Sequence, residues 1–394
     1  MAAIVTAQRI QLLRPTAVNS ILAEVRQLQA RGEKLISLMR GEPDFRTPPH
    51  IVEAAQRALR NGRTAYPDNR GEPALREAVA EKLLRDNGLR YDPGREILIT
   101  SGATFGIHAA FTALLNPGDE VILPEPLYDA YHSPALLAGG AVRTVAARIH
   151  KGRFTLDAAA IDAACTERTR VLLLNTPWNP TGAVFTAPEL AAIGEIVTRR
   201  NLVLVADEIY EAITYGAPHI SPAALSPELR ARTVLLNSFS KTYAMTGWRI
   251  GYCAAPAELI EAMFLALQQS SRGPATFVQD AGVEALRGPR DCVVEMREEY
   301  ARRRSLVCER LTGLAGCRVL APEGGFFAML DITPLGQPSN EVRRRLLNEH
   351  GVVVIHGSAY GAAGENTLRL SFASGGETLA RGLERLRTAF EVIR

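Results

Sequence analysis

The chain has 394 residues, of which 47% are hydrophobic and 22% are charged, and its formal net charge is +3. This balance is typical of a globular protein, and it gives no general basic signal for binding nucleic acid or an anionic membrane. No apolar run approaches the length of a membrane-spanning helix, and the first residues lack the pattern of a signal peptide. The five cysteines are scattered without CxxC spacing, which argues against a disulfide framework or a zinc site and predicts a reducing, cytoplasmic location without a bound metal.

The middle of the chain alternates short apolar runs with longer helical patterns. Continuous apolar strands that alternate with helices predict a mostly parallel sheet with helices on both faces. Ligands of such sheets bind at the carboxyl ends of the strands, so the polar loops after the runs are expected to converge on one site. The expected strands are residues 96–100, 120–123, 171–174, 202–206 and 234–236.

Both ends of the chain differ from the middle. Residues 20–31 show helical periodicity, and short strand-like runs at 326–330 and 368–371 lie among arginine-rich helical stretches. These patterns predict a smaller α+β domain built from both termini. We expect a large domain over residues 46–285 and a small domain formed by residues 1–45 and 286–394.

A lysine lies in a small-polar turn directly after the apolar run 234–236. Lys241 follows Ser238 and Ser240, and Arg249 comes eight residues later. A lysine that condenses with an aldehyde must be neutral, which burial or a nearby cation favours. Hydroxyls and a guanidinium are suited to hold a phosphate. The alternative interpretation is a surface Lys-Thr turn followed by a structural arginine.

A second anion site is predicted where the run 96–100 ends. Gly102, Ala103 and Thr104 open a helical pattern over residues 105–115. The N-terminus of a helix binds anions, and glycine lets the anion approach the backbone. An ordinary glycine turn with a threonine cap is the alternative.

Two further turns follow predicted strands. Asp207 ends an apolar strand, where a carboxylate needs a partner such as a protonated pyridine nitrogen. Tyr210 lies three residues later, within reach of the same ring. Asn179 begins an Asn-Pro-Thr-Gly turn that can place its amide at a ring oxygen and a substrate carboxylate. The alternatives are a helix-capping aspartate, a core tyrosine and a plain turn.

The remaining candidates are single residues with weaker local signals. Tyr128 can stack on a ring face, although it can equally be an ordinary packed aromatic residue. Arg369 is charged inside a strand pattern, which suits a bidentate grip on an α-carboxylate or an edge-strand position. Gly41 would let backbone approach the same carboxylate, and Tyr66 lies in a Thr-Ala-Tyr-Pro segment.

Four segments follow one another along the chain: the Asn-Pro-Thr-Gly turn, the Asp-Glu-Ile-Tyr strand end, the lysine segment and Arg369. Together they resemble the class I/II aminotransferases of fold type I, and the resemblance extends from about Arg14 to the C-terminus. The resemblance implies pyridoxal 5'-phosphate (PLP) as cofactor and a seven-stranded, mostly parallel sheet. It implies a transaminase that moves an amino group from an L-amino acid to a 2-oxo acid, pyruvate or 2-oxoglutarate, with ping-pong kinetics. A PLP-dependent β-lyase is the alternative, because its lysine surroundings would be nearly the same.

The resemblance also implies roles for the residues. Lys241 would form the Schiff base and move the α-proton, Asp207 would pair with the pyridine nitrogen, and Tyr210 and Asn179 would contact the ring hydroxyl. Tyr128 would cover the ring. Arg369, Asn179 and Gly41 would bind the α-carboxylate. Tyr66 would reach the phosphate of the other subunit, which implies a homodimer with shared sites. The phosphate is expected among Gly102, Ala103, Thr104, Ser238, Ser240 and Arg249.

The sequence constrains the choice of substrate less than it constrains the cofactor and the reaction class. Thr104 stands where some bacterial aspartate-using relatives have a lysine. Our hypothesis is that Arg40 or Arg272 binds an acidic side chain or acidic oxo acid. The alternative is that both are surface or structural arginines and that the enzyme uses a neutral substrate with pyruvate as acceptor. A PLP-binding transcription regulator is disfavoured because only some forty residues precede Gly41. A dehydrogenase is disfavoured because no G-x-G-x-x-G lies at a strand-helix junction.

Overall fold

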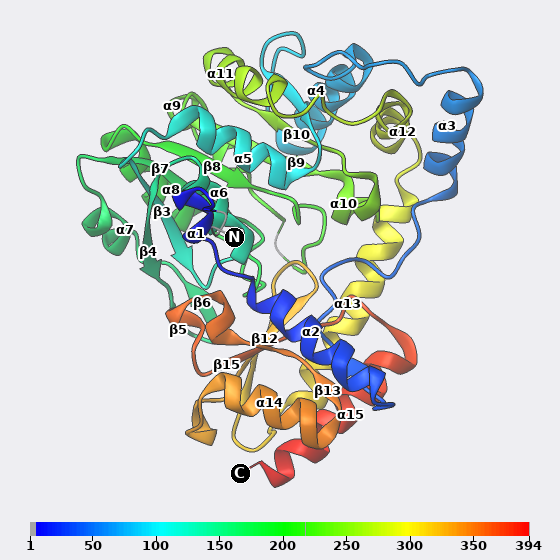
Figure 1. Ribbon diagram of the computed structural model, residues 1–394, viewed down its shortest axis with the longest axis vertical. Coiled ribbons are helices and arrows are strands. Elements are labelled where there is room, and N and C mark those ends of the chain that lie inside the picture. Colours follow the sequence, from blue (N-terminus) through cyan, green and yellow to red (C-terminus); the bar gives the residue numbers. More distant parts are fainter. Residues whose placement is uncertain (1–4, 217, 394) are drawn as a thin grey trace.

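The computed structural model describes residues 5–216 and 218–393 (Figure 1). A seven-stranded sheet occupies the upper part of the view, and its strand order is β2-β10-β9-β8-β7-β3-β4. Neighbouring strands are parallel except for β10, which runs antiparallel to both β2 and β9. The strands are β2 (Ile97–Thr100), β3 (Glu120–Glu125), β4 (Ala141–Ala146), β7 (Thr169–Asn175), β8 (Val203–Asp207), β9 (Thr233–Ser238) and β10 (Gly251–Ala254).

Helices cover both faces of this sheet because its strands are apolar on both sides. Leu98, Val234 and Leu236 pack on one face with helices α5 and α11, whereas Ile99 and Leu235 point to the other face. This alternation is the period of two that strand geometry imposes. The covering helices are α3 (Pro49–Arg60), α4 (Pro73–Asn87), α5 (Ala103–Leu114), α6 (His132–Leu137), α7 (Ala158–Ala164), α8 (Ala187–Arg199), α9 (Pro227–Arg230), α11 (Ala257–Gln268) and α12 (Thr276–Arg287).

A second core forms around a four-stranded sheet at the bottom of Figure 1. Its strand order is β11-β12-β15-β14. Strand β1 near the N-terminus pairs with β13, so the two ends of the chain meet there. The elements are α2 (Ala17–Ala30), β1 (Ile36–Ser37), α13 (Asp291–Leu311), β11 (Arg318–Leu320), β12 (Phe327–Asp331), α14 (Ser339–His350), β13 (Val352–Val353), β14 (Ile355–His356), β15 (Thr367–Ser371) and α15 (Gly376–Val392).

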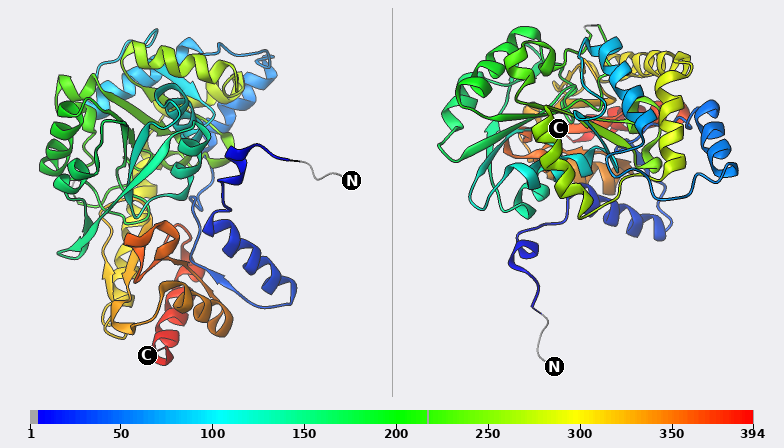
Figure 2. Two further views of the ribbon diagram at one scale, coloured as in Figure 1. Left: turned by 60° about the vertical axis from the view of Figure 1, so that its left-hand side comes forward. Right: turned by 90° about the horizontal axis from the view of Figure 1, so that it is seen from above.

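Short elements complete the described chain. Figure 2 shows α1 on an N-terminal segment that stands away from the rest of the molecule, and none of its four residues is buried. Among the described residues, no helix has both the length and the apolarity needed to cross a membrane. The short elements are α1 (Gln8–Gln11), the hairpin β5 (Arg148–His150) and β6 (Arg153–Thr155), α10 (Phe239–Thr242), and the 3-10 turns 129–131, 222–224, 246–248, 333–335, 357–360 and 362–364.

The predicted fold class, a mostly parallel α/β sheet with helices on both faces, is confirmed. All five predicted strands exist, and the predicted helices at 20–31 and 105–115 correspond to α2 and α5. Strand β10 was not expected. It follows the lysine turn directly, without the helix that a parallel crossover requires, and therefore enters the sheet antiparallel between β2 and β9.

Candidate active site

The carboxyl ends of the parallel strands open into a cavity of about 300 Å³ that residues of both sheets line. Asn175, Asp207 and Ser238 end the neighbouring strands β7, β8 and β9, so register alone brings them together. The cavity unites twelve of the predicted site residues, which come from distant parts of the sequence. They are Gly41, Ala103, Thr104, Tyr128, Asn179, Asp207, Tyr210, Ser238, Ser240, Lys241, Arg249 and Arg369.

Lys241 lies on α10, the single helical turn that follows β9. Ser238 caps this turn by accepting a hydrogen bond from the Ser240 amide at 3.0 Å. The Lys241 ammonium donates to the carbonyl oxygen of Gly41 at 2.7 Å. Burial, opposed by Glu42 and assisted by nearby Arg249, lowers the pKa of Lys241 to about 8. A sizeable fraction of this amine is therefore neutral near physiological pH.

Asp207 is the buried carboxylate of the cavity, with 2% of its surface exposed. It accepts hydrogen bonds from the Tyr131 hydroxyl at 2.6 Å and from the Ile209 amide at 3.3 Å. Burial raises the pKa of Asp207 to about 6, although the Tyr131 bond works in the opposite direction. Asn175 holds the strand end by donating from its side chain to the Asp207 carbonyl at 2.9 Å. The site thus positions an acidic group that lacks a cationic hydrogen-bond partner among the described residues.

An anion cradle forms another part of the same cavity. Helix α5 begins at Ala103 without a side-chain cap, so its first amide groups keep their hydrogen-bonding capacity. The hydroxyls of Ser238 and Ser240 are 2.8 Å apart. Arg249 adds a guanidinium that donates to the Thr246 carbonyl at 3.0 Å. A helix N-terminus, two hydroxyls and a guanidinium together are suited to a phosphate dianion.

Glycine is required at the start of this cradle. Gly102 has a φ of +85°, and a Cβ built there would lie 2.6 Å from Nη2 of Arg249. Only glycine therefore allows the guanidinium to lie against the backbone that leads into α5. Arg249 itself has a left-handed φ of +53°, a backbone conformation that is unfavourable for a residue with a side chain.

Arg369 comes from β15 of the smaller sheet and is 4% exposed. Its Nη1 lies 3.4 Å from Oδ1 of Asn179, and its Nη2 donates to the Met39 carbonyl at 3.2 Å. Its Nε is buried without a hydrogen-bond partner among the described residues. The guanidinium also lies 4.2 Å from the centre of the Phe327 ring. Arg369 therefore retains N–H groups that can donate hydrogen bonds to a carboxylate.

Two tyrosines form apolar walls with polar tips. Tyr210 is buried against Phe326, with ring centres 5.5 Å apart, and Tyr128 meets Tyr131 edge to face at 5.4 Å. Burial raises the pKa of both Tyr210 and Tyr128, so their hydroxyls stay protonated and can donate. Both line the cavity that contains Lys241.

Four predicted residues do not line this cavity: Gly102, which directly precedes the lining residue Ala103, and the three residues Tyr66, Arg272 and Arg40. Tyr66 is 82% exposed, and the Arg272 guanidinium stacks on its ring at 4.9 Å. Arg40 donates to the carbonyl oxygens of Glu42 and Pro43 on its own loop, at 3.1 and 3.2 Å. None of the three lines the cavity of their own chain.

The residues present fit the predicted cofactor. PLP needs an amine, a carboxylate for its ring nitrogen, donors for its phenolic oxygen and a phosphate cradle. The cavity offers these as Lys241, Asp207, Tyr210 and the α5 cradle. Gly102 lets the Arg249 guanidinium lie close to the start of α5, which adds positive charge where the phosphate is expected.

Tyr131 and Asn175 also line the cavity, although neither was predicted from the sequence. Asn175 carried the same signal as Asp207, a polar residue at the end of an apolar strand, and could have been found that way. Tyr131 follows Tyr128 by three residues in a loop and a short 3-10 turn. No sequence pattern points it at Asp207, because that contact is made across 76 residues.

The comparisons with known proteins agree with this geometry. The family model of Aminotransferase class I and II matches residues 33–386. The aspartate aminotransferase of Geobacillus stearothermophilus is 37% identical over 391 residues, covering 98% of each chain. The aspartate/prephenate aminotransferase of Thermus thermophilus is 40% identical over 381 residues, covering 96% of this chain and 97% of the relative.

Solved structures give the same result. The aspartate aminotransferase of Thermus thermophilus with maleate superposes with a TM-score of 0.92 at 39% identity, over 98% of this chain and 100% of that one. The enzyme of Rhizobium meliloti gives 0.95 at 36% identity, over 99% of each chain. The predicted family, cofactor and reaction class are confirmed, and none of these relatives is named as a β-lyase. The chain belongs to the class I and II aminotransferases of fold type I and is a PLP-dependent transaminase.

Proposed function

We propose that this transaminase uses an acidic L-amino acid such as aspartate as donor and an acidic 2-oxo acid as acceptor, with Lys241 as its Schiff-base lysine. The observation that carries the assignment of Lys241 is that it lines one cavity together with the buried carboxylate of Asp207 and the α5 cradle. When bound, PLP supplies an aldehyde that takes up the amino group and a ring that withdraws electrons from the substrate Cα.

Lys241 moves the proton in this proposal. Its pKa of about 8 leaves part of the side chain neutral at physiological pH, so Nζ can accept the proton from the substrate Cα. The carbonyl of Gly41 accepts a hydrogen bond from Nζ at 2.7 Å and so limits where the amine can point. Asp207 holds a proton between its carboxylate and the ring nitrogen, because a buried carboxylate without a cation favours a protonated partner.

Other residues orient the reactants. Arg369 grips the α-carboxylate with Asn179 and Gly41 beside it. Tyr210 would donate to the phenolic oxygen of the cofactor, and Tyr128 would cover the ring face. The residues that would hold the phosphate are Gly102, Ala103, Thr104, Ser238, Ser240 and Arg249. Together they fix the distance between Nζ and the Cα proton, which accounts for much of the rate in such reactions.

We infer a homodimer with shared sites from Tyr66 and Arg272. The two side chains stack on each other, are accessible, and do not line the cavity of their own chain. In such a dimer, Tyr66 of one subunit would contact the cofactor phosphate in the site of the other subunit. Arg272 of the same subunit would bind the distal carboxylate of the substrate in that neighbouring site. Arg40 is less suited to that role because its guanidinium is held by backbone carbonyls of its own loop.

The acidic substrate follows from charge and from the relatives. Several relatives are named aspartate aminotransferases, and maleate, named with the Thermus thermophilus structure, is a dicarboxylate. Thr104 offers no positive charge for a second carboxylate, so we propose that Arg272 binds it.

We also propose a large domain of residues 46–285 and a small domain of residues 1–45 and 286–394. The two separate sheets and the pairing of β1 with β13 support this division. The five free cysteines support a cytoplasmic location.

The first experiment is the visible absorption spectrum of the purified holoenzyme with one L-amino acid at a time and no acceptor. We expect L-aspartate to bleach the band of the bound cofactor and to release one equivalent of its oxo acid per site. Lys241→Ala should lack that band. A band that L-aspartate leaves intact while neutral amino acids bleach it would reject the acidic donor, and an unchanged band in Lys241→Ala would reject the lysine assignment.

A further inference from the structure

A second cavity lies behind the lysine turn, on the side away from the active site. We call it the rear cavity, and its volume is about 250 Å³. Ser238 lines both cavities, so one residue of β9 separates the two spaces at that point. The lining of the rear cavity includes Lys82, Asp86, Glu211, Asn237, Phe239, Tyr243, Tyr252, Leu286, Arg290 and Arg297.

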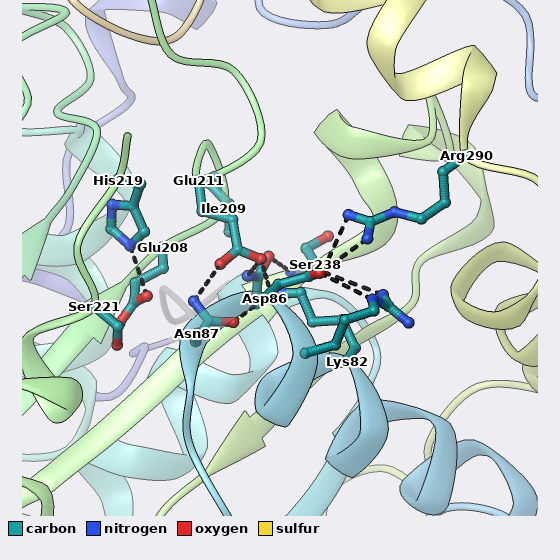
Figure 3. A network of polar contacts seen from close by, with 12 residues as sticks. Lys82, Asp86, Asn87, Glu208, Ile209, Glu211, His219, Ser221, Ser238 and Arg290 are labelled. Carbon is teal, nitrogen blue, oxygen red and sulfur yellow. Dashed lines mark hydrogen bonds and ion pairs between the residues drawn. The ribbon is translucent and has the colours of Figure 1, made fainter. Parts of the chain in front are cut away.

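The carboxylate deepest in this wall is already satisfied. Glu211 forms an ion pair with Lys82 and accepts hydrogen bonds from Asn237 at 2.7 Å and Asn87 at 2.9 Å (Figure 3). Burial alone would raise the pKa of Glu211, but Lys82 and the hydrogen bonds outweigh it and lower the pKa, so the carboxylate stays charged. A ligand therefore gains little by donating to Glu211.

The other carboxylate is also occupied. Asp86 accepts two hydrogen bonds from Arg290, at 2.9 and 3.2 Å (Figure 3), and two from Arg85, also at 2.9 and 3.2 Å. Lys82 and Arg290 are thus balanced by Glu211 and Asp86. The fifth charged residue of the cavity wall, Arg297, is exposed and forms no hydrogen bond or ion pair with the part of the chain that the structure describes. The lining carries an excess of one positive charge.

Two tyrosine hydroxyls add further donors. Tyr243 and Tyr252 are 6% and 3% exposed, and neither hydroxyl forms a hydrogen bond with a residue in 5–216 or 218–393. Neither is among the fully buried polar atoms that lack a partner in the described residues, so both oxygens reach open space, and both residues line the rear cavity. Burial raises the pKa of both tyrosines, so the hydroxyls stay protonated. Each hydroxyl is therefore free to donate to a ligand in the cavity.

We propose that the rear cavity binds a small carboxylate anion with an apolar body, at a site separate from that of the amino acid substrate. The carboxylate takes the unpartnered donors of Tyr243, Tyr252 and Arg297, because the acceptors of the wall are already filled. The apolar body lies against Phe239 and Leu286, which are buried side chains of the same lining. Burying an apolar group there is favourable, and the charge excess favours a monoanion.

Isothermal titration calorimetry with benzoate tests this proposal. The protein is the holoenzyme carrying Arg369→Ala, which removes the guanidinium proposed to bind the substrate carboxylate. We expect saturable binding of one benzoate per chain. Arg297→Gln in this background should weaken binding about tenfold, and Tyr243→Phe several-fold, since each removes a donor to a charged group. Arg302→Gln, which changes an exposed arginine on the same helix outside the cavity, should leave binding unchanged.

Three results of these titrations would contradict the proposal. No saturable binding up to about 10 mM benzoate, a weak limit for a specific site, would overturn the proposal. Equal affinities of the Arg297→Gln, Tyr243→Phe and Arg302→Gln proteins would overturn it as well. Inorganic phosphate that binds more tightly than benzoate would reject the apolar carboxylate. Because Arg297 is exposed, Arg297→Gln should fold and still tests the proposal if Tyr243→Phe does not fold. All variants carry Arg369→Ala, so differences in benzoate affinity between them do not depend on the role of Arg369.

Discussion

The hydroxyl of Tyr131 donates a hydrogen bond of 2.6 Å to Oδ2 of Asp207, the buried carboxylate at the end of β8. Burial raises the pKa of Asp207, and this bond is the largest influence that lowers it. Because burial keeps Tyr131 itself protonated, its hydroxyl acts as a fixed donor. Tyr131 is therefore the residue that favours the ionised form of Asp207.

Tyr131→Phe removes that donor while keeping the ring. A hydrogen bond to a charged group contributes about 1.5–3 kcal/mol, so we expect kcat/KM to fall about tenfold or more. The pH dependence of the cofactor absorption band should shift as well, because the pKa of Asp207 rises when this donor is lost and the carboxylate then binds a proton more tightly. Tyr91→Phe, which removes a buried hydroxyl without a partner among the described residues, is the control. A Tyr131→Phe enzyme with the parent pH profile would contradict this role.

Asp207 should destabilise the cofactor-free protein at high pH. Its folded pKa of about 6 lies above the ordinary value of 3.8, so its contribution to stability is present below pH 4 and is lost as the pH rises through 6. Asp207→Asn stays neutral and should raise the free energy of unfolding by about 2–3 kcal/mol at pH 8, with little effect near pH 4. Urea denaturation of both cofactor-free proteins measures this. An equal difference at the two pH values would show that the charge is not the cause.

The pKa of Lys241 predicts how the cofactor-free protein takes up PLP. Only the neutral amine attacks an aldehyde, so the rate of covalent uptake should rise with pH through about 8 and then level off. Stopped-flow absorbance after mixing with PLP gives this rate. Lys241→Ala should show no covalent phase. A rate that keeps rising up to pH 10 would mean that burial does not lower the pKa of this lysine.

Gly102→Ala should weaken the phosphate cradle. Its Cβ would lie 2.6 Å from the Arg249 guanidinium, at a φ of +85°. The backbone strain costs about 1 kcal/mol of stability, and displacing Arg249 should weaken PLP binding about tenfold or more. Gly118→Ala is a matched control, because Gly118 has a φ of +88° and nothing within 4 Å of its Cβ. Both variants should lose similar stability, but only Gly102→Ala should lose PLP affinity in a fluorescence titration.

Shared sites predict complementation between two inactive variants. In a dimer of one Lys241→Ala subunit and one Arg272→Ala subunit, the site with an intact Lys241 receives Arg272 from its partner. After unfolding and refolding an equimolar mixture, activity towards L-aspartate should return to roughly a quarter of the parent value, because half of the dimers are mixed. Arg40→Ala should leave that activity nearly unchanged. Mixtures that regain no activity would place Arg272 outside the neighbouring site.

Some features of this protein were determined by local sequence. The apolar runs before Asp207 and Ser238 define central strands, and parallel topology then places their ends on one edge. Gly102 and Lys241 could be predicted because the chemistry they serve restricts residue type at short range. The family resemblance rested on the same short segments, which is why cofactor and reaction class could be inferred without coordinates.

Tertiary structure decided what depends on distant contacts. The bond from Tyr131 to Asp207 joins residues 76 positions apart, and Lys241 meets the carbonyl of Gly41 across 200 positions. The lowered pKa of Lys241 and the raised pKa of Asp207 both arise from burial, which depends on how the two sheets close over the cavity. No local pattern encodes that closure, because desolvation is a property of the packed chain and not of a segment.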